Sequence, residues 1–270
     1  MHCYFVSDLH GSIERYKKLF DLLGSNPPDV LFLGGDLLPH RSIEGQIDFI
    51  ENILKCSFQK LRTELNDKYP RVLIILGNDD ARIVEGDIIA LDSDGIWEYI
   101  HEGKAVFDNF TVFGYSNVPP TPFLFKDWER YDVSKDINPR CIPFENGRRT
   151  VPIDEKILYS TTIAGDLEKL TEGFDPDKSI LLIHTPPYKT NLDLLANRIP
   201  VGSVAVRRFI EKYQPKLSLH GHIHESACVS GSWMDKIGET FCFSAAHDGP
   251  KLAVVQFDIE NLEDARRVLI

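Results

Sequence analysis

Cysteine is scarce in this chain, and the few cysteines present form no pattern. The 270 residues contain five of them, far apart and without a CxxC pair: Cys3, Cys56, Cys141, Cys228 and Cys242. An odd number of widely spaced cysteines argues against the disulfide framework of a small secreted domain. We therefore expect a protein of a reducing compartment, the cytoplasm.

Long apolar runs are also missing. No apolar stretch reaches the roughly 18 residues that a membrane-spanning helix needs. Met1 leads directly into HCYFVSDLHG, without the basic and apolar regions of a cleavable leader. We expect neither a membrane partner nor secretion, which again indicates the cytoplasm.

Basic residues are too few for a protein that binds nucleic acid by its overall charge. There are 30 Lys and Arg residues against 41 Asp and Glu residues, and the formal net charge is -11. Neutralising many phosphates requires a basic surface. A nucleic-acid partner is therefore not expected, although a local basic groove stays open as an alternative.

The chain has enough hydrophobic residues for a core, and its first part alternates predicted strands and helices. Hydrophobic residues make up 43% of the chain, enough to bury a substantial core, and we expect residues 1–270 to form one domain. Strands are predicted over about 2–7, over about 29–34 and in the apolar run of RVLIILGNDD, with helical patterns between them, the longer over about 43–65. This alternation is typical of a parallel α/β sheet.

The second half of the chain is less regular. KAVFDNFTVFGYS predicts a hairpin that turns at Asp108 and Asn109. A Pro-rich and aromatic loop follows, and helices are expected over about 153–172 and within VGSVAVRRFIEKY. SILLIH and PKLSLH read as strands, and TFCFSAAHDGPKLAVVQFDI reads as closing antiparallel strands.

Polar side chains recur where the predicted strands end. Five apolar strands are each followed by at least one carboxylate, amide or imidazole: Asp8 and His10, Asp36, Asn78 and Asp79, His184, and His220, His222 and His224. Because the carboxyl ends of strands in open α/β sheets form a ligand-binding crevice, we expect these groups to meet there. Oxygen donors and imidazoles together suit Mn, Fe, Zn and similar ions. The sequence predicts a metal site at the carboxyl ends of the strands.

At these residues the chain resembles the calcineurin-like metallophosphoesterases. The family pattern is met, in order, by DLH (8–10), GD (35–36), GND (77–79), IHTPP (183–187) and GHIH (221–224). The resemblance implies an α/β fold of two packed mixed β-sheets flanked by helices, a four-layer α-β-β-α sandwich. It also implies a phosphoesterase that acts on a small phosphodiester or phosphomonoester.

The family's ligand set, carried over by position, implies two divalent metal ions, with Mn favoured over Fe or Zn. Asp8, His10 and His224 would hold one ion, and Asn78, His184 and His222 the other. Asp36 would bridge both ions. Two such ions share a bridging hydroxide and clamp the attacking and leaving oxygens of a displacement at phosphorus.

Asp79 departs from the family pattern. The residue after Gly-Asn is commonly a histidine that stabilises the phosphate or protonates the leaving group, so Asp79 stands at a catalytic position. With an ordinary pKa near 3.9 the carboxylate would be ionised and would repel phosphate, unless burial or a metal ligand keeps it protonated. The local alternative is a helix cap, because Asn and Asp commonly follow a strand and begin a helix. We expect an active but modest hydrolase, or one restricted to substrates with good leaving groups.

Three further residues are candidates for substrate binding. Asn117 and the prolines after it could form a rigid wall over the metals, or a structural surface loop. Gly202 and Ser203 stand at a predicted helix start, a potential anion site, where plain capping by Ser203 is the alternative.

Two other functions stay open beside a dinuclear phosphohydrolase. A nuclease of the same family is disfavoured by the acidic balance and by the absence of a basic and aromatic track. A binding or scaffold protein on the same fold is favoured only by Asp79, and the complete ligand set argues against it. The oligomeric state is not predicted.

Overall fold

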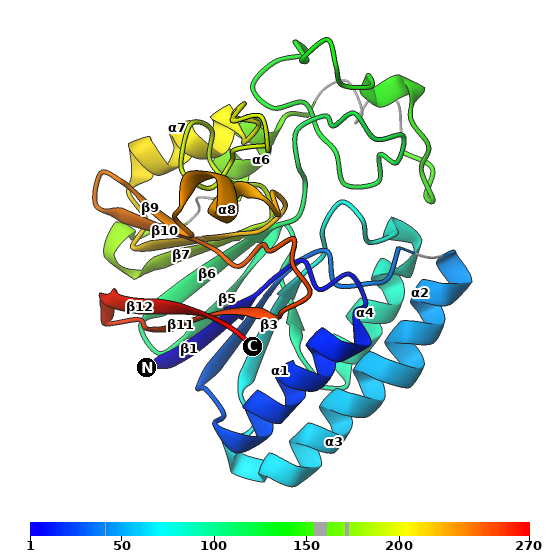
Figure 1. The fold of residues 1–270 in the computed structure, drawn as a ribbon, viewed down its shortest axis with the longest axis vertical. Helices are drawn as coiled ribbons and strands as arrows, with labels where there is room; N and C mark the ends of the chain where they lie inside the picture. Colours follow the sequence, from blue (N-terminus) through cyan, green and yellow to red (C-terminus); the bar gives the residue numbers. More distant parts are fainter. Residues whose placement is uncertain (41, 154–160, 171–172) are drawn as a thin grey trace.

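Two six-stranded sheets form the centre of the computed structural model, which describes residues 1–40, 42–153, 161–170 and 173–270 (Figure 1). The first sheet has the order β12-β11-β1-β2-β3-β4. Its strands are β1 (His2–Val6), β2 (Val30–Gly34), β3 (Arg71–Ile75), β4 (Glu98–Tyr99), β11 (Ala253–Asp258) and β12 (Asn261–Leu269). The strands β1 to β4 are parallel, and β11 and β12 extend the sheet antiparallel. The predicted alternation of parallel strands and helices in the first part of the chain is confirmed.

The second sheet has the order β5-β6-β7-β8-β10-β9. Its strands are β5 (Gly103–Phe107), β6 (Phe110–Tyr115), β7 (Ser179–Ile183), β8 (Leu217–His220), β9 (Met234–Ile237) and β10 (Thr240–Ser244). The strands β6, β7, β8 and β10 run parallel, and β5 and β9 are antiparallel edges. The hairpin predicted to turn at Asp108 and Asn109 is therefore present as β5 and β6.

The strands alternate their side chains between two buried layers. In β1, Cys3 and Phe5 pack in the core between the two sheets, whereas Tyr4 and Val6 pack in the core beneath the first helices. Because neighbouring residues of a strand point to opposite faces, a strand buried on both sides must be apolar throughout. This explains the continuous apolar runs that precede each polar strand end.

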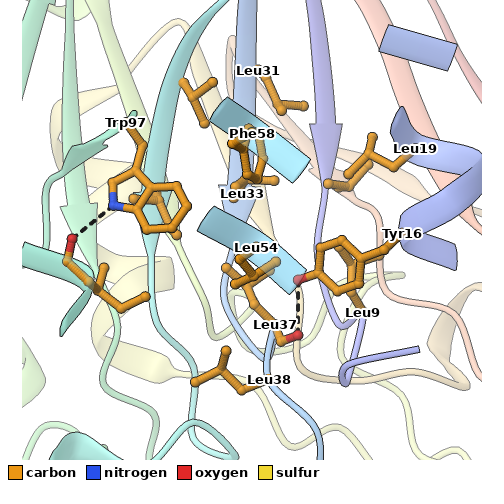
Figure 2. Packing of buried hydrophobic residues seen from close by; sticks show 14 of the residues in the cluster. Leu9, Tyr16, Leu19, Leu31, Leu33, Leu37, Leu38, Leu54, Phe58 and Trp97 are labelled. Carbon is orange, nitrogen blue, oxygen red and sulfur yellow. Dashed lines mark hydrogen bonds between the residues drawn. The ribbon is translucent and has the colours of Figure 1, made fainter. Parts of the chain in front are cut away.

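Helices cover the outer face of each sheet. The first sheet carries α1 (Ile13–Ser25), α2 (Ile43–Phe49), which continues through a π-helical segment (Ile50–Lys55) into α3 (Cys56–Leu65), and α4 (Glu85–Ser93). Figure 2 shows this layer, in which Tyr16 donates a hydrogen bond to the Leu37 carbonyl and Trp97 donates one to Ile88. The second sheet carries α6 (Ile163–Leu170) and α7 (Val204–Tyr213), and a short α8 (Ser226–Ser230) follows β8. The α-β-β-α sandwich is confirmed.

One sequence expectation needs correction, and another is described only in part. The closing strands do not pair with each other, because β10 lies in the second sheet parallel to β8, whereas β11 lies in the first sheet beside β1. The helix predicted over 153–172 is seen as α6, and residues 154–160 and 171–172 lie outside the described residues.

The described helices were also compared with what a membrane-spanning helix requires. None of them combines the length and apolar content that crossing a bilayer requires.

Candidate metal centre

The polar residues that follow the strands meet at one edge of the two sheets. Asp8, Asp36 and Asn78 lie just beyond β1, β2 and β3, which are neighbours in the first sheet. His184 and His222 lie just beyond β7 and β8, which are neighbours in the second sheet. The packing of the two sheets brings both sets face to face.

Their donor atoms form two groups that share one residue. One group consists of Asp8, His10, Asp36 and His224, and the other of Asp36, His184 and His222; within each group the ligand atoms lie within 4.8 Å of one another. Asn78 belongs beside the second group, since its Oδ1 lies 3.2 Å from His184 Nε2. All seven residues implied by the motifs are thus brought together, with Asp36 common to both groups.

Distances inside the first group indicate a place for a cation. His10 Nε2 lies 3.0 Å from His224 Nε2, which lies 3.1 Å from Asp8 Oδ1. Two imidazole nitrogens and a carboxylate that converge in this way suit a divalent ion of the Mn, Fe or Zn type. The residues present therefore fit the metal that the motifs imply.

Hydrogen bonds outside the donor groups orient these side chains. His184 Nδ1 lies 2.7 Å from the Gly34 carbonyl oxygen and donates its proton there, which turns Nε2 toward Asp36 Oδ2 at 3.2 Å. The backbone N–H of His222 donates to Asp8 Oδ1 at 2.9 Å, and that of Asp79 donates to Asp36 Oδ1 at 2.8 Å. Such contacts fix tautomer and geometry before an ion binds.

The backbone is strained at four of the seven donors. Asp8, His10, Asp36 and His222 have φ values of 56°, 47°, 52° and 73°. L-residues rarely adopt this left-handed region, and such strain concentrates at functional sites. A residue in this conformation ends the extended path of the strand. Its side chain therefore points into the crevice.

Burial and mutual charge perturb the titration of the donors. Burial opposes ionisation of Asp8, but the hydrogen bond and the charge of His224 outweigh it and lower the Asp8 pKa to about 2. Burial also disfavours the charged form of His184 and of His224, yet Asp36 raises the pKa of His184 to about 10, and Asp8 raises that of His224 to about 9. In the metal-free chain these two imidazoles therefore hold protons at neutral pH.

This protonation predicts that metal binding releases protons. Ligand imidazoles must be neutral, so Mn binding at pH 7 has to displace the protons of His184 and His224. The affinity for Mn should therefore rise as the pH rises from 7 to 9. Calorimetric titration of metal-free protein in two buffers of different protonation enthalpy measures the number released. His224→Gln should release fewer protons, and a binding enthalpy that is independent of the buffer would contradict the prediction.

Asp80 belongs to the site although the sequence motifs did not single it out. It is fully buried, and its carboxylate accepts hydrogen bonds from the backbone N–H groups of Leu37, Leu38 and Gly77 at 2.8 to 3.3 Å. These bonds join the loop after β2 to the loop after β3, which carry Asp36 and Asn78. The two consecutive aspartates in GNDD are the sequence feature that could have indicated this role.

Asp79 lies beside the first donor group. Its Oδ2 lies 3.7 Å from His10 Nδ1 and 3.5 Å from His40 Nδ1, and the His40 ring stacks on His10 with centroids 4.4 Å apart. Burial, followed by the charges of Asp36 and Asp80, raises the pKa of Asp79 to about 8 in the metal-free chain. His40 is nevertheless an exposed residue, with 60% of its side chain accessible. The side chain of His101 is largely buried, and its Nδ1 accepts a hydrogen bond from Ser116 N at 3.0 Å.

The anion site predicted at Gly202 and Ser203 is already filled by the protein. Ser203 caps α7, with its Oγ accepting from Val206 N at 3.0 Å, and the carboxylate of Asp132 accepts from Ser203 Oγ and from Val204 N. A Cβ on Gly202 would lie 2.6 Å from the Pro186 carbonyl oxygen. The substrate-binding prediction for these two residues is replaced by the capping alternative, because an internal carboxylate occupies the helix N-terminus.

The prolines after Asn117 line a cavity at the metal donors, whereas Asn117 itself does not. Residues 119–123 line a cavity together with Asp36, Asn78 and His222, as a wall over the donors would. Asn117 is fully buried and is not among the residues that line this cavity. Its predicted contact with substrate is therefore not supported by its position.

Comparisons with known proteins identify the family and similar folds. Residues 1–226 match the model of a family described as calcineurin-like phosphoesterase, whereas no curated protein gave a match. The crystal structure of TT1561 of Thermus thermophilus is similar in fold, with 16% identity and a TM-score of 0.60 over 99% of this chain and 98% of that one. A dimetal phosphatase from Danio rerio is similar with 10% identity and a TM-score of 0.53, over 95% and 91% of the two chains.

Proposed function

Because the chain belongs to the calcineurin-like phosphoesterase family, we propose that it hydrolyses a small phosphodiester or phosphomonoester with the help of two divalent metal ions. The observation that carries the proposal is the pair of donor groups that share Asp36. A single structural ion would not require a second set of donors around the same carboxylate.

In the proposed enzyme, Asp8, His10 and His224 would hold one ion, Asn78, His184 and His222 would hold the other, and Asp36 would serve both. Such a pair of ions supplies an activated water and neutralises the charge of the phosphoryl oxygens. Mn is the favoured ion, because the set combines carboxylate and amide oxygens with imidazoles and contains no thiolate. The chain contributes the buried carboxylates and the oriented imidazoles that keep the ions in place.

Substrates of small size are favoured over nucleic acid. The net charge of -11 would repel a polyanion, whereas two divalent ions create a positive potential only locally. The alternative of an inactive binding protein is disfavoured, since all seven donors are present and converge.

The proposal is tested by metal content and turnover measured on the same preparation. Elemental analysis after loading with Mn should give two ions per chain, and chromogenic monoesters and diesters should be hydrolysed. Chelation should abolish turnover and Mn should restore it. Full activity after thorough chelation would overturn the metal-dependent mechanism, and bound metal without turnover on any ester would favour the binding protein.

Asp79 provides a second prediction about this site. Divalent ions favour the carboxylate over the neutral acid, so we expect metal binding to lower the raised pKa of Asp79. The ionised side chain then repels phosphate and cannot protonate a leaving group. Asp79→His should raise turnover on alkyl esters, which have poor leaving groups, by about 100-fold, the lower end for general acid catalysis.

Asp79→Asn is the matched control for this prediction. It removes the charge without adding a proton donor, so the gain should be smaller and equal for aryl and alkyl phosphodiesters. A large loss of activity in Asp79→Asn, greatest on alkyl esters, would show that the neutral acid already donates the proton.

A further inference from the structure

A cavity of about 300 Å³ opens directly onto the candidate metal centre. Asp36, Asn78, His222 and His224 form one end of it. A phosphoryl group placed at these donors would therefore direct one of its substituents into the cavity.

The walls away from the metal donors are mainly apolar. One wall comes from the segment after β6 and includes Pro119, Pro122 and Phe123, and the facing wall comes from the loop between β7 and α7 and includes Leu195, Ile199 and Val201. Apolar walls with few polar groups are typical of a site for a small organic group.

The proline wall is held rigidly before any ligand binds. Lys126 and Glu129 are both buried, and Lys126 Nζ lies 2.7 Å from Glu129 Oε2 and 2.8 Å from the Thr121 carbonyl. Thr121 N donates to the same Glu129 oxygen at 3.1 Å. Separating this pair would leave a buried charge unpaired, which is strongly destabilising. Binding therefore does not have to order this segment.

The facing wall is also preformed. The carboxylate of Asp193 accepts hydrogen bonds from the backbone N–H groups of Lys189, Thr190 and Gly202 at 2.9 to 3.0 Å. Leu195 N donates to the Ile199 carbonyl at 3.0 Å, which closes a tight turn. Leu195 and Ile199 are consequently presented to the cavity by a fixed backbone.

Charge on the cavity walls is sparse beyond the metal donors. Asp79 lies at the metal end of the cavity, next to Asn78. Among the described residues that line the other walls, Arg140 and Glu225 are the charged ones, and Glu225 Oε1 accepts a hydrogen bond from Ala196 N. Thr121 and Asn138 add uncharged polar side chains. A volume of about 300 Å³ accommodates a short chain or one ring and not a polymer.

We infer that the substrate carries one uncharged apolar substituent, a short alkyl chain or a single aryl ring, that occupies this cavity while the phosphoryl group lies at the metal donors. The inference rests on the proposed function and adds the chemical class of the substrate. It assigns specificity to the apolar side chains of the two walls.

Binding of phosphonates that cannot be hydrolysed tests the inference. Calorimetry on Mn-loaded protein compares ethyl-, propyl-, butyl- and phenylphosphonate. Each added methylene should tighten binding about 4-fold, the value for burying one CH₂ group. Phenylphosphonate should bind at least as tightly as butylphosphonate, and 2-carboxyethylphosphonate should gain nothing over ethylphosphonate.

Matched variants locate the effect. In Ile199→Ser, each added methylene should tighten binding by less than about 2-fold, because part of the apolar wall is lost. Val201→Phe narrows the cavity and should weaken butylphosphonate more than ethylphosphonate. Ile89→Ser changes an exposed isoleucine on α4, outside the cavity, and should leave the whole series unchanged.

The outcomes separate this inference from the proposed function. Equal affinities along the series would overturn the inference. So would a gain in affinity per methylene that is the same in Ile199→Ser as in the wild type. Turnover of phosphodiesters is measured on the same preparation. Hydrolysis together with equal affinities along the series, or with no phosphonate binding, overturns the inference alone. Affinities that rise along the series without hydrolysis overturn the proposed function alone. The absence of both phosphonate binding and hydrolysis in Mn-loaded protein overturns both.

Discussion

Asp36→Asn should abolish hydrolysis and weaken both metal sites. Asp36 is the one residue that belongs to both donor groups, and its Oδ2 lies 3.2 Å from His184 Nε2. An amide has no negative charge and cannot bridge two cations as a carboxylate does. Loss of several kcal/mol of charge stabilisation corresponds to a decrease in turnover of about 1000-fold or more. Elemental analysis should find fewer than two ions per chain.

Asn78→Ala is the contrasting variant for Asp36→Asn. Asn78 lies beside only the second donor group, so its loss should reduce the occupancy of one ion and leave the other bound. Thermal unfolding of both variants without metal confirms that each is folded. Two ions per chain and near-normal turnover in Asp36→Asn would contradict the bridging assignment.

Gly77→Ala should be nearly as damaging, although glycine carries no functional group. A Cβ at this position would lie 2.7 Å from His184 Nε2 and still closer to the Asp36 carboxylate. Both atoms belong to the second donor group, so one of them must move. We expect the second ion to be lost and turnover to fall by about 100-fold or more, since displacing a positioned catalytic group by 1 Å can lower the rate to that extent.

Gly86→Ala is the matched control for this prediction. Gly86 lies on α4, and nothing lies within 4 Å of the position that its Cβ would take. Alanine should stabilise the helix by up to about 1 kcal/mol and leave metal content and turnover unchanged. Normal activity in Gly77→Ala would show that the donors tolerate displacement, and an equal loss in both variants would indicate a general effect on folding.

The strand-end residues were predictable because their signal is local. Each candidate donor follows a short apolar run by one to four positions, and parallel strands place their carboxyl ends at one edge. The four positive φ values explain why Asp and His, which tolerate this region better than β-branched residues, stand at these ends. The layer order followed from the same alternation of strands and helices.

The contacts that the sequence did not reveal are long-range. Ser203 looked free to bind an anion, but Asp132, 71 positions away in the chain, occupies the same N–H groups. The closing strands were expected to be antiparallel, but β10 pairs parallel to β8 in the second sheet and β11 pairs with β1 in the first sheet. The apolar cavity joins walls near residues 120 and 199, and no periodic pattern links two irregular loops. Only the packed chain brings these groups together.

The most direct test of the dinuclear centre is anomalous diffraction from crystals of the protein loaded with Mn. We expect two anomalous peaks per chain, one among Asp8, His10 and His224 and the other among Asn78, His184 and His222, with the Asp36 carboxylate between them. A single peak, or peaks remote from these residues, would contradict the account.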